Sequence, residues 1–390
     1  MSALSCPACG AAAMGDPFYS ATGVPTNSVR LLADRRQALA VPRGDIRLAC
    51  CAACGFVANV AFDPARVDYS PGYESTQRHS PTFDAFHRDL ARSLATRHDL
   101  GGRTVLEIGC GRGEFLALLC AEAGCRGVGC DPAWNPAEPA PEGAVRILPT
   151  FYEAMPGEPA DLVCCKMTLE HVPRPAALVR LVATRQGAGT RLFVQVPNAR
   201  PIFERAAFWD VYYEHCNYFD AASLAGLLAR AGFGVEELAE TYAGQYLTAH
   251  AVALPAPPPV PSPRPAATGS FAVGAAAAIA AWRAWLAALE RGGRRVVLWG
   301  GGSKAVAFLA ALAPCPAVAA AVDINPRKDG TFLAGTGHPV VAPERLPSLR
   351  PDAVVVMNPI YLAEVRARLD ALGLSLPLHS VEAGPGCPTA

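Results

Sequence analysis

The sequence carries no net formal charge, because its 34 Lys and Arg residues balance 34 Asp and Glu residues. Without an excess of positive charge the chain has no global field that would attract a polyanion, so we do not expect it to bind nucleic acid. The first residues, MSALSC, lack the basic stretch and apolar core of an export signal. The alanine-rich stretches are interrupted by Pro, Arg or Gly well short of a membrane span. We therefore expect a cytoplasmic protein without membrane contacts, either a monomer or a weak oligomer.

The sequence is long and contains many cysteines. With 390 residues, 51% of them hydrophobic, the chain is long enough for two or three domains with sizeable cores. Its 14 cysteines would indicate disulfides in a short secreted chain, but in a long chain without an export signal the paired ones indicate a metal site. Others, such as Cys110, Cys164 and Cys165, lie in apolar strand contexts and are predicted core residues.

Two CxxCG units mark the N-terminal segment, one at residues 6–10 and one at residues 51–55. Each offers two thiolates from one tight turn, and the glycine after the second cysteine supplies the permissive backbone dihedral. Four thiolates fit the closed tetrahedral site of a structural zinc ion, with chance or redox-active pairs as the alternatives. The segment between the units must then fold as a small lobe, predicted to span residues 1–80. Cys50 could replace its neighbour as a ligand. The predicted ligands are Cys6, Cys9, Cys51 and Cys54.

Residues 105–119, VLEIGCGRGEFLALL, have the pattern of an apolar strand, a glycine-rich turn and an apolar-faced helix. This pattern predicts a cofactor site, because Gly109 and Gly111 allow the backbone to approach a ligand closely. Asp131 follows a second strand-like run at about the twenty-residue spacing at which a βαβ unit presents a carboxylate to a ribose diol. The glycines are not in the register of a dinucleotide fingerprint, and Glu107 lies inside the end of the strand. A glycine turn that serves only packing is the alternative.

Alternating elements around this motif predict a doubly wound α/β domain over residues 81–253. Residues 83–98 form a predicted amphipathic helix, because apolar residues recur there at three- and four-residue steps. A strand, a helix and a strand follow around residues 104–131. Alternation of this kind is typical of a parallel sheet with helices on both faces. Further short strands are predicted at residues 145–148, 162–165 and 192–196.

A proline-rich segment, LPAPPPVPSPRPAA, separates this domain from the rest of the chain. It is too rich in proline for a helix or a central strand, so residues 254–268 are predicted to form an extended linker. Beyond an alanine-rich helix at 275–290, residues 295–312 repeat the plan of strand, glycine turn and helix, and Asp323 ends the next strand. Residues 269–390 are therefore predicted to be a second Rossmann-like domain.

The segment DVYYEHCNYF at residues 210–219 gathers tyrosines, a carboxylate and a histidine after the fifth predicted strand. Loops at the carboxyl ends of a parallel sheet are where ligands bind in this architecture. A histidine such as His215, beside Glu214 and the phenol of Tyr212, can be tuned toward neutral pH as a general base. A hydrogen-bonded structural patch is the alternative.

The cysteine units, the ExGCGxG motif, the YxEH segment and the second Rossmann-like part, in this order, resemble a known family over nearly the whole chain. These are the three-domain sugar C-methyltransferases of deoxysugar pathways in antibiotic or polysaccharide biosynthesis, which use S-adenosylmethionine (SAM) to methylate carbon 3 of nucleotide-linked 4-keto sugars. The resemblance implies SAM and a structural Zn²⁺ as cofactors and a nucleotide diphosphate sugar as substrate. The residues it implies for the SAM site are Glu107, Gly109, Gly111, Asp131 and Met167.

In that family the YxEH residues line the sugar site. The resemblance therefore implies His215 as the base, Glu214 as the group that orients it, and Tyr212 as the hydroxyl that stabilises an enolate or shares the proton. A second family histidine corresponds to His171 in LEHVPRP, although LEHV is also a recurrent methyltransferase strand-end sequence. The chemistry fits, because a ketone acidifies the neighbouring C–H and its enolate needs one base and polar stabilisation but no catalytic metal. His171 and Tyr212 stay open as alternative bases.

The GGGSK turn of the second Rossmann-like part puts backbone amides, Ser303 and Lys304 at a helix start, a place suited to phosphate. We expect these residues to hold the nucleotide diphosphate together with Asn358, which resembles a Trp-Asn element of the family. The family turn usually reads more like GAxxKG, so the nucleotide stays open, and a lobe that only packs is the alternative. Tyr73, in the loop before the helix at 83–98, is predicted to cap the site unless that loop is only surface.

Two other functions remain alternatives. A SAM-dependent O-, N- or C-methyltransferase acting on another small natural-product intermediate would keep the same cofactor site. A zinc-ribbon RNA-binding methyltransferase or a non-catalytic binding module belongs to a different class, and the neutral charge disfavours it.

Overall fold

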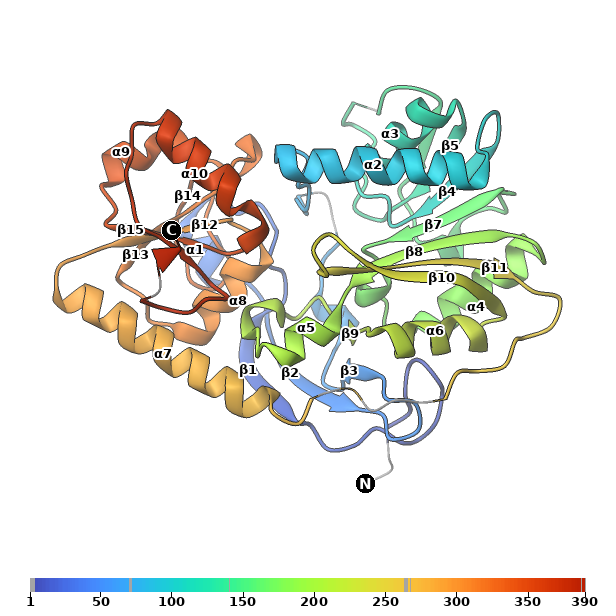
Figure 1. Ribbon diagram of the computed structural model, residues 1–390, viewed down its shortest axis with the longest axis horizontal. Coiled ribbons are helices and arrows are strands. Elements are labelled where there is room, and N and C mark those ends of the chain that lie inside the picture. Colours follow the sequence, from blue (N-terminus) through green and yellow to red (C-terminus); the bar gives the residue numbers. More distant parts are fainter. Residues whose placement is uncertain are drawn as a thin grey trace.

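The computed structural model describes residues 4–69, 72–139, 141–262, 266, 268–386 and 388–389. The strands in these residues form three sheets, of four, seven and six strands. In Figure 1 the seven-stranded sheet lies at the right and the C-terminal six-stranded sheet at the left, with the N-terminal sheet (blue) below and between them. Hydrogen bonds join each of the three parts to the other two.

The seven-stranded sheet has the order β10-β11-β8-β7-β4-β5-β6. Strands β4 to β8 run parallel, which confirms the strands predicted from the alternating pattern. Successive apolar side chains point to opposite faces and pack under helices on each side. The strands are β4 (Thr104–Ile108), β5 (Arg126–Cys130), β6 (Val145–Leu148), β7 (Leu162–Lys166), β8 (Arg191–Pro197), β10 (Phe233–Thr241) and β11 (Tyr246–Ala253).

The prediction of a parallel sheet is wrong at one edge of this domain. Strand β11 is antiparallel to both β8 and β10. The turn between β10 and β11 comprises only residues 242–245, and a connection this short can join antiparallel strands but not parallel ones. The sheet is therefore mixed, and its tight turn brings Gln245 to the wall of the cavity described below.

Helices cover both faces of this sheet (Figure 1). The helix predicted at 83–98 is confirmed as α2 (Pro81–His98), which begins at Ser80, whose hydroxyl accepts a hydrogen bond from the Phe83 N–H. Helices α2 and α3 pack on one face, and α4 and α6 pack on the other. The remaining helices here are α3 (Glu114–Ala123), α4 (Pro175–Gln186), α5 (Ala199–Glu204) and α6 (Ala221–Arg230).

The N-terminal sheet is completed by a strand from the middle of the chain. Its order is β1-β2-β3-β9, all antiparallel, and β9 begins two residues after His215. The free edge of β3 leaves backbone groups unpaired, and β9 satisfies them. The segment 1–80 predicted as a lobe is thus not self-contained, because its sheet is closed by residues 217–218. The elements are β1 (Tyr19–Pro25), α1 (Arg35–Leu39), β2 (Arg43–Cys50), β3 (Val57–Asn59) and β9 (Asn217–Tyr218).

The C-terminal sheet has the order β14-β13-β12-β15-β16-β17 and is parallel except for β17. The strand, glycine turn and helix predicted at 295–312 are confirmed, and Asp323 directly follows β13. The glycine turn lies at the carboxyl end of β12, as in Rossmann-like units. The elements are α7 (Phe271–Arg291), β12 (Val296–Trp299), α8 (Ser303–Leu312), β13 (Val318–Val322), β14 (Val340–Val341), α9 (Leu346–Leu349), β15 (Ala353–Val356), α10 (Leu362–Ala371), β16 (Leu378–Ser380) and β17 (Pro388–Thr389).

The predicted linker lacks regular secondary structure in its described residues, whereas a long helix follows it. The described residues of the linker contain no helix or strand, and residues 263–265 and 267 lie outside the described residues. The alanine-rich helix predicted at 275–290 is confirmed as α7. Contrary to the expectation that Arg or Gly breaks such stretches well short of a membrane span, α7 has the length and apolar composition of one. One face of α7 packs on α8, where Trp282 is 1% exposed and lies edge-on to Phe308 at a centroid distance of 5.2 Å.

Close packing between β2 and the segment that carries His215 leads to a first prediction. A Cβ atom at Gly44 would lie 2.2 Å from Cε2 of the buried Tyr213 ring. We expect Gly44→Ala to lower the free energy of unfolding by about 1–3 kcal/mol, because the ring has no room to move. Gly157→Ala is the control, since a Cβ there meets nothing within 4 Å. Urea unfolding measures the free energy of unfolding of both variants. Equal losses in the two variants would contradict the close contact between Gly44 and Tyr213.

Candidate active site

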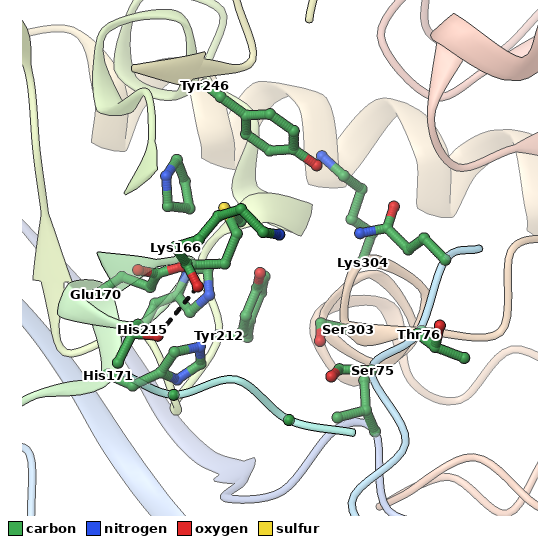
Figure 2. A pocket seen from close by; sticks show the side chains of 18 of the residues that line it. Ser75, Thr76, Lys166, Glu170, His171, Tyr212, His215, Tyr246, Ser303 and Lys304 are labelled. Atoms are coloured by element: carbon green, nitrogen blue, oxygen red, sulfur yellow. Dashed lines mark hydrogen bonds between the residues drawn. The ribbon is translucent and has the colours of Figure 1, made fainter. Parts of the chain in front are cut away.

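One large cavity of about 1180 Å³ opens where the three parts of the chain meet. Its walls include the glycine turn after β4, the glycine turn after β12 and the loop that precedes α2. The carboxyl ends of the parallel strands of two sheets therefore face the same space, which the sequence alone could not establish. Figure 2 views this cavity, with Lys166, Glu170 and His215 on one side and Ser303 and Lys304 on the other.

The turn after β4 is held to the acid after β5 by the backbone. The Gly111 N–H donates to Asp131 Oδ2 at 2.8 Å, and the Ala133 N–H donates to Oδ1 at 2.8 Å. Gly109 has a φ of 70°, and a Cβ there would lie 2.2 Å from the Thr168 hydroxyl oxygen. Only glycine fits this position, and the carboxylate keeps free lone pairs that can accept from a ribose diol.

The other two residues predicted for the cofactor also lie on this wall. Glu107 is 2% exposed, and its Oε2 atom has no hydrogen-bond partner in the described part of the chain. Burial raises the pKa of Glu107 to about 7. Met167 has a φ of 52°, and its N–H donates to the Gln195 carbonyl at 2.7 Å. The structure thus brings the predicted cofactor residues to one place.

The C-terminal unit repeats this arrangement with one difference. The Gly301 N–H donates to Asp323 Oδ2 at 2.9 Å, and the Asn325 N–H donates to Oδ1 at 2.9 Å. The ammonium of Lys328 also lies 2.9 Å from Asp323 Oδ2. The acid that could accept from a ribose in this unit is therefore already neutralised by a lysine.

Three of the predicted catalytic side chains form one aromatic cluster, in which His215 is buried and the other two are half-buried. The His215 ring, 6% exposed, lies 4.1 Å from the Tyr212 ring and 4.8 Å from the His171 ring between centroids. Burial, reinforced by His171 and Lys304, lowers the pKa of His215 well below its usual value. Burial also lowers the pKa of His171 to about 4. Both imidazoles are therefore neutral at physiological pH. The expected tuning toward neutral pH is wrong, because the same burial makes both rings weaker bases than a free histidine.

The predicted role of Glu214 in orienting His215 is wrong. Its Oε1 atom accepts hydrogen bonds from the Ser28 hydroxyl at 2.7 Å and from the Ser28 N–H at 2.5 Å, and its Oε2 atom has no partner among the described residues. The carboxylate therefore faces Ser28 in the loop after β1, whereas the imidazole lines the cavity. The carbonyl of Glu214 instead accepts from His171 Nδ1 at 3.1 Å.

Glu170 is the carboxyl group that lies beside the two histidines. One of its oxygens and one ring nitrogen each of His171 and His215 lie within 4.8 Å of one another. Glu170 is 1% exposed, and both of its oxygens lack hydrogen-bond partners in the described part of the chain. Burial raises the pKa of Glu170 to about 8, so the group is largely protonated at neutral pH.

The residues predicted to hold a diphosphate all line the cavity, but each already has a partner in another part of the chain. The Ser303 hydroxyl lies 2.7 Å from the Ser28 hydroxyl and donates to it, because the single proton of Ser28 goes to Glu214. Lys304 forms an ion pair with Asp210. The Asn358 side chain exchanges two hydrogen bonds with Gln245, each of 2.9 Å. These contacts connect the C-terminal unit to the other two parts.

The loop before α2 reaches the histidine pair. The Tyr69 hydroxyl lies 3.2 Å from His171 Nδ1, and the Tyr73 ring lies 5.5 Å from the Tyr69 ring. Burial, increased by the Glu214 charge, raises the pKa of Tyr73 well above its usual value, so its hydroxyl stays protonated. Tyr73 lies in the cavity wall and not on a surface loop.

Four cysteine sulfurs gather away from this cavity. Cys6 Sγ lies 3.7 Å from Cys54 Sγ, Cys9 Sγ lies 3.8 Å from Cys51 Sγ, and all four lie within 4.8 Å of one another. Cys50 is not part of this group, because its sulfur faces the Gly55 carbonyl at 3.5 Å. The geometry therefore selects Cys51 over Cys50 as the member of the cluster.

Sequence reasoning missed three residues that the structure brings into the site. Glu170 could have been noted, because it directly precedes His171. Lys166 could also have been noted, because a charged residue that ends the buried run LVCCK is unusual. Ser28 carries no such signal, since its contact with Glu214 joins residues far apart in the chain.

Comparison with known proteins gives two family matches and several relatives. Residues 77–238 match the family described as methyltransferase domain, and residues 265–373 match the family described as C-methyltransferase C-terminal domain. C-methyltransferase NovU of Streptomyces niveus is 30% identical over 35% of this chain and 34% of its own length. A ubiquinone biosynthesis O-methyltransferase of Pseudomonas paraeruginosa is 33% identical over 27% of this chain and 49% of its own length. The chain thus aligns with half or less of these curated relatives.

Among solved structures, a 1,6-didemethyltoxoflavin-N1-methyltransferase of Burkholderia thailandensis with bound S-adenosylhomocysteine aligns at 20% identity. The alignment covers 44% of this chain and 80% of that chain, with a TM-score of 0.36.

Asp131 and Asp323 offer a matched test of the cofactor wall. We expect Asp131→Ala to weaken the binding of S-adenosylhomocysteine (SAH) by about tenfold to a hundredfold, because charged hydrogen bonds to the ribose and to the glycine turn are lost. Asp323→Ala removes the corresponding carboxylate from the C-terminal unit and should leave SAH binding unchanged. Calorimetric titration measures both, and equal losses would contradict the assignment of the donor site to the turn after β4.

The family matches and the geometry agree on the cofactor. The methyltransferase match covers β4, its glycine turn and Asp131, and the second match covers the Rossmann-like unit with the GGGSK turn. The chain therefore carries a class I SAM-dependent methyltransferase domain, followed by a C-methyltransferase C-terminal domain.

Proposed function

We propose that the protein is a SAM-dependent C-methyltransferase that acts on a nucleotide-linked keto-deoxysugar, with His215 as the base. The observation that carries this proposal is the shared cavity. Its walls hold the donor turn after β4, the neutral imidazole of His215 and the glycine turn of the C-methyltransferase C-terminal domain. An acceptor in this space can contact the base and the donor together, as a positioned displacement requires.

The size and charge of the cavity support a nucleotide-linked acceptor. Pockets for one small ligand usually measure about 300–1,000 Å³, so about 1180 Å³ leaves room for both a donor and an acceptor. Lys304 and Lys328 both lie on the C-terminal wall. A diphosphate there would compete with Asp210 and Asp323 for these two ammonium groups.

The side chains around His215 suit enolate chemistry. SAM supplies the methyl group from its sulfonium when bound. The neutral His215 ring can take the proton from the carbon beside the ketone, and the Tyr212 hydroxyl, protonated because burial raises its pKa, can donate to the oxygen that gains charge. Glu170 lies beside this ring, and a positive charge on the imidazole would lower the pKa of its carboxyl group. Tyr69 and the Glu214 carbonyl hold the His171 ring.

Methyl transfer to oxygen or nitrogen of another small intermediate is the second candidate. The similarity to ubiquinone biosynthesis O-methyltransferases favours it, because those relatives match this chain at comparable identity. The same histidine could deprotonate a hydroxyl. The match to a C-methyltransferase C-terminal domain supports carbon as the acceptor. Product mass and position-specific NMR separate the two candidates.

The cysteine cluster fits a structural zinc ion. With Zn–S bonds of about 2.3 Å, the edge of a tetrahedron of sulfurs measures about 3.8 Å. The distances of 3.7 Å and 3.8 Å between paired sulfurs match this edge. Cys6, Cys9, Cys51 and Cys54 would fill all four positions, so the ion would hold the lobe together and take no part in catalysis.

Cys50 provides an internal control for the zinc site. We expect the purified protein to contain about one zinc per chain, and Cys54→Ser to lose it and to unfold at a lower temperature, because a thiolate ligand is removed. Cys50→Ser should keep both the metal and the stability. Elemental analysis and thermal unfolding measure the two variants. Zinc retained in Cys54→Ser would place the metal elsewhere.

His215 can be tested separately from cofactor binding. We expect His215→Asn to lower the turnover of a 4-keto nucleotide sugar by about a hundredfold to ten-thousandfold, since the general base is lost. In deuterated water the wild type should also place deuterium on the carbon beside the ketone, and the variant should not. Calorimetry with SAH is the control, and its affinity should be the same in both proteins.

Two outcomes would contradict this account in different ways. Normal turnover by His215→Asn would transfer the role of base to His171 or Tyr212. Failure of the wild type to methylate or exchange any 4-keto nucleotide sugar, while it binds SAH, would reject the sugar as acceptor.

A further inference from the structure

The cations that line the cavity differ in one respect. Six lysine and arginine side chains contribute to its walls. Five of them form ion pairs with carboxylates. Lys166 is the exception, because no carboxylate oxygen of the described residues lies within 4.0 Å of its ammonium. The five paired cations are Arg112, Arg200, Arg205, Lys304 and Lys328.

Lys166 is held in the cavity by neutral groups. It is the last residue of β7, and Figure 2 shows its side chain extending into the cavity. Its Nζ atom lies 3.3 Å from His87 Nε2 and 5.0 Å from the centre of the Phe115 ring. Burial lowers the pKa of His87 to about 2, so this ring is neutral and its Nε2 atom accepts from the ammonium. These contacts orient the ammonium but leave its charge without a counter-ion.

A buried acid lies near this cation on the same face of the sheet. Glu107 is paired with Cys164 in the register of β4 and β7, and Lys166 lies two residues beyond Cys164. Residues two apart on a strand point to the same face and lie about 7 Å apart. Glu107 Oε2 also lacks a hydrogen-bond partner in the described part of the chain. The end of the donor turn therefore presents one cation and one acid side by side.

We propose that Lys166 binds the α-carboxylate of the methionine moiety of SAM, with Glu107 close enough to accept from its α-ammonium. This moiety carries one group of each sign, so it complements the pair. The two groups would then select a donor with an intact amino acid and fix the direction of the methionine chain toward the histidines. The inference rests on the SAM-dependent part of the proposed function and is independent of the acceptor.

The test compares SAH with 5′-methylthioadenosine, which has the same nucleoside and thioether but no amino acid. We expect Lys166→Met to weaken SAH binding by about tenfold to a hundredfold and to leave methylthioadenosine binding unchanged, because only the carboxylate contact is lost. Methionine keeps the aliphatic contact with Phe115. Lys166→Arg should retain most of the preference for SAH. Calorimetric titration of the wild type and of both variants with each of the two ligands measures these affinities.

Controls distinguish this role from others. Arg200→Met removes a different cation of the same cavity, one already paired with Glu204 and Glu240, and should leave both affinities unchanged. Equal weakening of SAH and methylthioadenosine by Lys166→Met would mean that Lys166 only shapes the pocket. If Lys166→Met leaves SAH binding unchanged but loses the binding of uridine or thymidine diphosphate, Lys166 would belong to the acceptor site. Either result overturns the inference, whereas a wild type that binds neither SAH nor methylthioadenosine would reject SAM dependence itself.

Discussion

The arrangement of the molecule depends on one buried junction around the Glu214 carboxylate. Ser28 of the N-terminal part donates twice to this carboxylate, and its hydroxyl also contacts Ser303 at the start of α8. Hydrogen bonds to a charged group contribute about 1.5–3 kcal/mol each, and a buried carboxylate without them would be costly. Because Glu214 precedes His215, the same contacts that join the three parts also fix the backbone of the proposed base.

This junction explains how three sheets produce one site. Strand β9 binds the segment after His215 to the N-terminal sheet, while Asn358 and Gln245 tie the C-terminal unit to the central sheet. The donor wall and the C-terminal wall then face each other across the cavity. The C-terminal unit has kept the acid and glycine amide of a nucleotide-binding turn, but Lys328 neutralises the acid. This acid is therefore a poorer acceptor for a ribose hydroxyl than Asp131, and a diphosphate would reach Lys304 and Lys328 only in competition with their carboxylate partners.

Local sequence patterns predicted the local structure well and the long-range contacts poorly. The strand, glycine turn and helix around Gly109, and the same plan around Ser303, follow from hydrophobic periodicity and turn chemistry within short windows. The antiparallel β10–β11 edge and the pairing of β9 with β3 depend on contacts between distant residues. Similarly, adjacency in YEHC suggested that Glu214 orients His215, but Ser28 binds the Glu214 carboxylate, and Glu170 is the carboxyl beside the ring.

The central claim is that donor, acceptor and the His215 ring meet in one cavity. Diffraction from crystals grown with SAH and a 4-keto nucleotide sugar, or a stable analogue of it, tests this directly. The account predicts SAH against the Gly109 turn and Asp131, the diphosphate on the wall of Lys304 and Lys328, and the sugar between the SAH sulfur and His215. An acceptor bound on another surface, or a His215 ring shielded from both ligands, would contradict it.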